Sequence, residues 1–228
     1  MAALVRATAG RMLPSVPMPY AWPAGISARA APLTSLSLRR PVMALNPSFG
    51  SRESYTRTAI ALHWLIALLI VCGFALGWVM TDIPGFTPTK LRYFSWHKWI
   101  GVTVFALAVL RILWRATHSA PVMPRRMPAW QRGAAHVVHL LLYVLMIAIP
   151  ASGYLYSSAA NVPVVYLGLI PLPRLIAPDP HLKELLKNVH ITLNYTLLVL
   201  VALHVAAALK HQWLDRDGLL SRMLPFLK

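Results

Sequence analysis

Four long apolar segments constrain the fold of this sequence more than any other feature. A helix of about 20 apolar residues crosses the roughly 30 Å hydrocarbon core of a bilayer. Only 12% of the 228 residues are charged, which is about half the share found in a soluble domain. We therefore predict an all-α integral membrane protein built as a four-helix bundle. The predicted spans are residues 57–80, 94–115, 134–156 and 188–211.

The first 52 residues differ from the rest of the chain. They hold six arginines, no acidic residue and no long apolar run. The lack of an apolar core argues against a secretory signal peptide. We expect either a basic, disordered tail or a start codon assigned too far upstream, with Met43 as the alternative start. The transmembrane domain then occupies residues 53–228.

Lysine and arginine are unevenly distributed among the loops. The loop between the first two spans offers only Lys90 and Arg92, whereas both terminal segments and the loop after the second span are rich in basic residues. The positive-inside rule then places both termini in the cytoplasm of a bacterial-type inner membrane. Because the net charge of +16 collects at span ends, we do not expect nucleic-acid binding. The basic residues in and beside the loop after the second span are Arg111, Arg115, Arg125, Arg126 and Arg132.

Four histidines fall into two pairs when they are ordered by depth. His63 lies near the cytoplasmic start of the first span, and His97 lies near the outer start of the second. His190 lies near the outer start of the fourth span, and His204 follows fourteen residues later. Fourteen residues of helix rise about 21 Å and turn about 1400°, within roughly 40° of whole turns. Depth therefore pairs His63 with His204 in the inner leaflet and His97 with His190 in the outer leaflet.

Each pair suits an iron in a flat macrocycle, with one imidazole above and one below. Zinc prefers a tetrahedral set of three or four protein ligands, and no cysteine or carboxylate lies at either depth to complete one. The pattern favours two non-covalent b haems inside the bundle, because the chain has no CxxCH motif. A histidine-lined metal-ion transporter is the alternative from another functional class. It would need acidic ligands along its path, and the spans almost lack them.

Several motifs resemble the bacterial cytochrome b561 family in their order and their position on the spans. They are "YTRTAIALHW", "WHKWIGVTVFALAVLRILWR", "AHVVHLLLYVLMIAIPASGY" and "VHITLNYTLLVLVALHVAAALKHQW". The resemblance covers about residues 53–225. It implies that the four paired histidines are the axial ligands of two b haems. It also implies electron transfer between the quinone pool and a small-molecule or protein donor.

Two forms of this activity remain open within the family. Some members are described as superoxide oxidases that use ubiquinone as acceptor. Others would serve as a cytochrome b membrane subunit for a partner dehydrogenase. The short loops favour a protein that acts alone.

Three cations are candidates for pairing with haem propionates at the aqueous edges. Arg57 precedes His63 toward the cytoplasm, whereas Lys98 and Lys187 lie close to the outer histidines. The alternative is that each only helps to set the orientation of its span in the membrane or extends its charged end to the membrane surface. Lys98 and Lys187 would also attract superoxide to the outer face.

Two further histidines lie on one face near the inner end of the third span. His136 and His139 are three residues apart. They are candidates for contact with a propionate, for quinone protonation or for a stray metal, and the alternative is an interfacial polar role. We assign His211 a structural role.

Overall fold

Four long helices make up most of the protein in its computed structural model. The structure describes residues 54–124 and 127–227. The tail or late start expected over residues 1–52 lies outside these residues. The helices are α1 (Arg57–Asp82), α2 (Pro88–Thr117), α3 (Ala129–Ala159) and α4 (Pro180–Lys210).

Capping residues explain why α2 and α4 begin well before the predicted apolar spans. The side chains of Thr56, Thr87 and Asp179 each accept a hydrogen bond from a backbone N–H in the first turn of α1, α2 and α4. Pro88 and Pro180 follow two of these caps, at a position where a missing N–H costs no helical hydrogen bond. Hydropathy alone does not detect these polar first turns.

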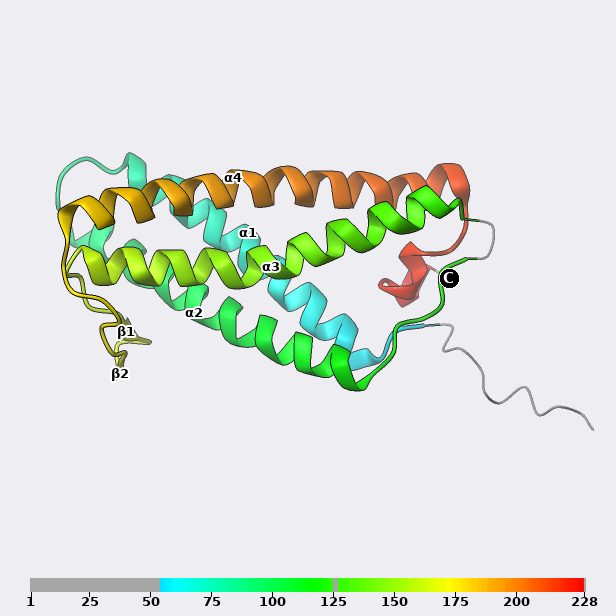
Figure 1. The fold of residues 1–228 in the computed structure, drawn as a ribbon, viewed down its shortest axis with the longest axis horizontal. Helices are drawn as coiled ribbons and strands as arrows, with labels where there is room; N and C mark the ends of the chain where they lie inside the picture. The colour runs from blue at the N-terminus through cyan, green and yellow to red at the C-terminus, as the bar shows by residue number, and fades with distance from the viewer. Residues whose placement is uncertain (1–53, 125–126, 228) are drawn as a thin grey trace, which may run out of the picture. The chain divides into compact units, whose positions relative to one another are not determined.

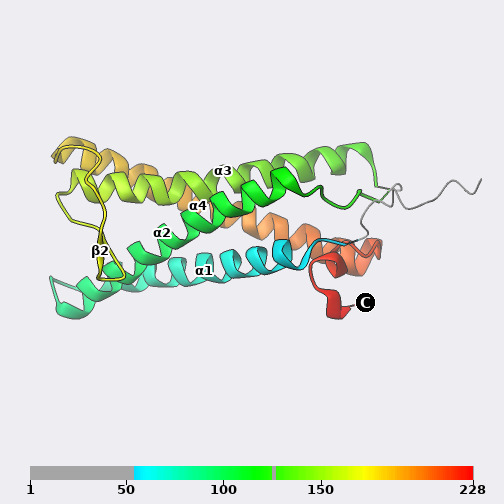
Figure 2. The ribbon, with the colours of Figure 1, turned by 90° about the horizontal axis from the view of Figure 1, so that it is seen from below.

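The helices pack in chain order, α1 on α2, α2 on α3 and α3 on α4, and all four run along the long axis of the bundle (Figures 1 and 2). Leu145 and Ile149 of α3 meet Leu197 of α4 in a buried cluster. Ile70 and Phe74 of α1 pack against that cluster. The core of the bundle therefore draws on side chains far apart in the sequence.

The outward faces of the helices are apolar. Large side chains such as Leu68, Leu113, Leu140 and Val199 are more than half exposed. Water would make such a surface costly, whereas acyl chains cover it without penalty. All four helices are long and apolar enough to cross a membrane. The protein is a multi-pass membrane protein, and the predicted all-α membrane fold is confirmed.

A short β-hairpin closes one end of the bundle (Figure 1). Strands β1 (Val165–Tyr166) and β2 (Ile170–Pro171) pair antiparallel. The turn needs a positive φ at Leu167 and Gly168, of 53° and 74°. The hairpin is fixed to α2, because the Trp99 indole donates to the Val165 carbonyl at 2.7 Å.

The C-terminal segment closes the opposite end (Figure 1). After α4 the chain makes a π-helical turn (His211–Asp215) and two short 3-10 turns (Leu220–Arg222 and Pro225–Leu227). The Trp64 indole donates to the Met223 carbonyl at 2.9 Å, which ties this segment to α1. Following the predicted orientation, we call the hairpin end the outer end and this end the inner end.

Candidate functional site

The four histidines predicted as ligands lie in two pairs, one toward each end of the bundle. The rings of His63 of α1 and His204 of α4 have centroids 6.3 Å apart and planes inclined at 68°. The rings of His97 of α2 and His190 of α4 have centroids 6.2 Å apart. We call them the inner pair and the outer pair. Each pair joins two helices, and α4 contributes to both.

Both separations match the space that one metal ion needs between two imidazoles. A metal–imidazole bond is about 2.0 Å long, and a ring centroid lies about 1.1 Å behind the bonded nitrogen, so opposed rings have centroids about 6.2 Å apart. Direct contact between imidazoles would bring the centroids closer than this. The spacing therefore fits a haem that would be held between the two imidazoles of each pair.

Hydrogen bonds orient both imidazoles of the outer pair. Nδ1 of His97 lies 3.0 Å from the Gly73 carbonyl, and Nδ1 of His190 lies 3.1 Å from the Ile149 carbonyl. Because a carbonyl only accepts, each Nδ1 carries the proton. This tautomer leaves the Nε2 lone pair of each ring available to a metal. The Ser152 hydroxyl also lies 3.1 Å from Nδ1 of His190.

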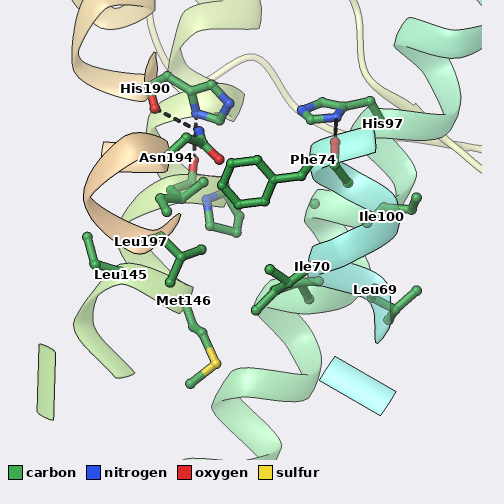
Figure 3. A pocket seen from close by; sticks show the side chains of 15 residues that line it. Leu69, Ile70, Phe74, His97, Ile100, Leu145, Met146, His190, Asn194 and Leu197 are labelled. Atoms are coloured by element: carbon green, nitrogen blue, oxygen red, sulfur yellow. Dashed lines mark hydrogen bonds between the residues drawn. The ribbon is translucent and has the colours of Figure 1, made fainter. Parts of the chain in front are cut away.

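The outer pair borders an apolar pocket lined by residues of all four helices (Figure 3). The two imidazoles lie on opposite sides of this pocket, and Phe74 projects between them from α1. Ile70, Leu145 and Leu197 form much of the remaining lining. Such a lining suits a porphyrin ring and excludes water from it.

Glycines allow neighbouring helices to approach the outer imidazoles closely. A Cβ added at Gly153 of α3 would lie 2.9 Å from Cε1 of His190, which is shorter than any normal contact. A Cβ added at Gly77 of α1 would lie 3.7 Å from Cε1 of His97. The position of His190 therefore depends on the absence of a side chain at residue 153.

The inner pair has polar neighbours instead. The His139 ring lies 5.3 Å from that of His204, which is closer than an intervening metal allows. Geometry therefore favours His63 over His139 as the opposing ligand. Arg111 of α2 lies close enough for its charge to act on all three imidazoles. Nδ1 of His136 lies 2.6 Å from the Arg132 carbonyl, one turn earlier on the same helix.

On each of the four helices, one residue near the inner pair lies fourteen positions from one residue near the outer pair. Since this spacing returns a helix nearly to the same face about 21 Å further on, it divides the eight positions into two layers. The inner layer contains His63, Arg111, His139 and His204, and the outer layer contains Gly77, His97, Gly153 and His190.

The three cations predicted for haem propionates have different surroundings. The Lys98 ammonium donates to the Pro163 carbonyl at 3.0 Å, in the loop before the hairpin. Lys187 lies 3.5 Å from the Glu184 carboxylate. Arg57 is the exposed first residue of α1. Sequence reasoning missed Arg111, which it treated as a topology charge, although its spacing of fourteen residues from His97 was a usable signal.

The model of one protein family, described as prokaryotic cytochrome b561, matches residues 54–226. The chain belongs to this family. Membership confirms the resemblance, and it identifies a transmembrane cytochrome b with b-type haem that acts as an oxidoreductase or electron carrier. It places the chain among cytochromes rather than metal-ion transporters.

Three curated relatives of this cytochrome agree with the assignment. Cytochrome b561 homolog 2 of Escherichia coli (strain K12) is 34% identical over 173 residues, covering 75% of this chain and 92% of the relative. Cytochrome b561 homolog 1 of the same organism is 30% identical over 171 residues, covering 75% and 97%. Probable superoxide oxidase CybB of Yersinia pestis is 30% identical over 178 residues, covering 76% and 97%.

Proposed function

We propose that this cytochrome binds two b haems and carries electrons between a donor at the outer end of the bundle and the quinone pool. His63 and His204 ligate the inner haem, and His97 and His190 ligate the outer haem. The observation that carries the proposal is the separation of ring centroids, 6.3 Å and 6.2 Å in two independent pairs.

The chain's own residues hold and insulate these groups. When bound, haem iron supplies one-electron redox chemistry. The Gly73 and Ile149 carbonyls fix the Nδ1 protons of the outer ligands, which makes Nε2 the metal-binding nitrogen. In this proposal Arg57 pairs with an inner propionate at the aqueous edge, and Lys98 and Lys187 pair with outer propionates.

We further propose that superoxide is the electron donor and ubiquinone the acceptor. Two superoxide anions each lose one electron and leave as O₂, and one quinone takes up the two electrons with two protons to become the quinol. A relative named a probable superoxide oxidase supports this reaction. Lys98 and Lys187 add positive charge at the outer end, which favours approach of an anion.

The proposed orientation has both termini in the cytoplasm and the chain in the inner membrane. Its support is the excess of lysine and arginine in the loop after α2 and in the C-terminal segment. The superoxide reaction then takes place on the side opposite the termini.

Haem quantification tests the proposal directly. The purified protein should contain about two b haems per chain by pyridine haemochrome assay, and His63→Ala and His97→Ala should each retain about one. His181→Ala, which changes an exposed histidine at the start of α4, should keep both. One haem in the wild type, or two in either ligand variant, contradicts the assignment.

A separate assay tests the electron donor. Superoxide generated outside proteoliposomes should reduce ubiquinone dissolved in their bilayer, and superoxide dismutase should abolish the reduction. If quinol does not form although both haems are present, the proposed pairing of superoxide with ubiquinone is wrong and the haem assignment stands.

A further inference from the structure

Arg111 occupies an unusual position for an arginine. It lies fourteen residues after His97 on α2, which places it on the ligand-bearing face at the depth of the inner pair. A guanidinium at membrane depth is energetically costly, and such a residue normally faces the interior and has a defined partner.

Two hydrogen bonds fix the guanidinium between α1 and α3. Nη1 donates to the Ala59 carbonyl at 2.8 Å, and Nε donates to the Tyr143 hydroxyl at 3.1 Å. The guanidinium carbon also lies 5.9 Å from the centroid of the Tyr143 ring. Ala59 precedes His63 by one turn, and Tyr143 follows His139 by one turn. Arg111 is therefore held beside the inner pair from two sides.

Both partners of Arg111 are neutral. Its charge forms no ion pair with a carboxylate among the residues that the structure describes. The six acidic residues of the chain are Glu53, Asp82, Asp179, Glu184, Asp215 and Asp217, and those described lie at helix ends or beyond them. The positive charge therefore remains uncompensated by the chain in the low-dielectric interior, where its field is strong.

We propose that Arg111 sets the redox potential of the inner haem. This inference rests on the proposed ligation by His63 and His204. Reduction adds one negative charge to the inner site, and a fixed neighbouring cation stabilises that reduced form. In the outer layer the position on α2 that corresponds to Arg111 is the proposed ligand His97, and the ammonium of the adjacent Lys98 donates to the Pro163 carbonyl in the loop before the hairpin. Arg111 thus raises the inner potential relative to the outer one and draws electrons inward.

The inference has a direct test in redox titration of the purified holoprotein. Each haem is titrated spectroscopically, with His97→Ala used to identify the inner one. Arg111→Gln should lower the inner midpoint potential, so that the ratio of reduced to oxidised inner haem falls about tenfold at a fixed potential, or about 59 mV for one electron. The outer midpoint should stay unchanged. Arg111→Lys should restore most of the potential because it restores the charge.

Two controls separate charge from structure. Arg115→Gln removes an exposed arginine one turn further along α2, where water and salt screen the charge, and it should leave both potentials in place. Tyr143→Glu keeps Arg111 but gives it a carboxylate partner, so it should lower the inner potential as Arg111→Gln does. This second variant decides the question if Arg111→Gln loses its inner haem.

Three results would overturn the inference. They are an unchanged inner potential in the variants that retain the haem, an equal shift of both haems, and an equal effect of Arg115→Gln. Each leaves the proposed ligation intact, because haem content is measured on the same samples. A wild type without two haems would instead overturn the proposed function.

Discussion

The inner and outer layers of the bundle present the same ligand geometry in different surroundings. Their histidine pairs have almost equal centroid separations, 6.3 Å and 6.2 Å. In the outer layer the neighbouring helices contribute glycine, and two backbone carbonyls orient the imidazoles. In the inner layer the two positions that are not proposed ligands carry His139 and Arg111. One scaffold therefore holds two similar sites whose steric and electrostatic environments are set by only two positions in each layer.

The difference separates two ways of specifying a metal site. The outer layer depends on close packing, so extra volume should damage it most. The inner layer depends on polar neighbours, so changes of charge or ligand choice should damage it most. Substitutions in one layer should leave the other layer largely unaffected, because about 21 Å of helix separates them.

The largest expected effect comes from adding one methyl group to the outer layer. Gly153→Ala forces the His190 ring away from a Cβ that would lie 2.9 Å from its Cε1. Haem content should fall from about two toward one per chain, with the inner haem retained. Gly133→Ala, on the same helix with no atom within 4 Å of the added Cβ, should keep both haems. Two haems in Gly153→Ala would show that His190 is not rigidly placed.

A second substitution tests which histidine opposes His204. Because the ring of His139 is too close to His204 for an intervening iron, His139→Ala should keep both haems. His63→Ala should lose the inner haem, as measured by pyridine haemochrome. The reverse result would exchange the roles of His63 and His139 while leaving the outer layer unaffected.

A smaller effect is expected from removing charge at one end of α4. Lys187→Gln should slow reduction by superoxide roughly twofold at low ionic strength, because one attracting charge is lost at the outer face. The difference should vanish at high salt. Lys210→Gln, at the inner end of the same helix, should not change the rate. Equal slowing by both variants would argue against an outer entry point for superoxide.

The smallest expected effect is acid fraying of the outer end of α4. The N–H groups of Leu182 and His181 hold the pKa of the Asp179 carboxyl below its usual range. The cap is therefore fully stabilising above the ordinary pKa of about 3.9 and is lost as pH falls through the lower folded value. Amide exchange in the first turn of α4 should increase over that acidic range. Asp179→Asn should show no such pH dependence, because asparagine caps without titrating.

Hydropathy and histidine spacing were enough to predict the fold and to select the paired residues. Each span was recognisable from composition alone, and depth brought together histidines that are more than 90 residues apart. The additional first turns of α2 and α4 were missed because they depend on capping by Thr87 and Asp179 and are not apolar. The hairpin was missed because its attachment depends on a tertiary hydrogen bond from Trp99.

The surroundings of the sites were less accessible to sequence reasoning. Lys98 and Lys187 were predicted as propionate partners from proximity in the chain, but the Pro163 carbonyl and the Glu184 carboxylate that they contact depend on how the loop folds. The role of Gly153 is a distance between two helices, which no local pattern encodes. Arg111 resembled any basic residue at a span end until its spacing from His97 was considered.

His190 and His204 are carried by one uninterrupted helix, and this has a consequence for electron tunnelling. Tunnelling rates decay exponentially with distance, so a flexible connection between two redox centres would give a broad range of rates. A regular helix instead fixes the separation of the two histidines through its constant rise per residue. A single inserted residue between the two histidines would lengthen their separation along the helix by about 1.5 Å and would rotate one imidazole by about 100° about the helix axis. Such an insertion would remove one histidine from its pair, and this loss would stop electron transfer before the added distance slowed it. The number of residues between His190 and His204 can therefore change only by steps that keep both imidazoles on the same face of α4.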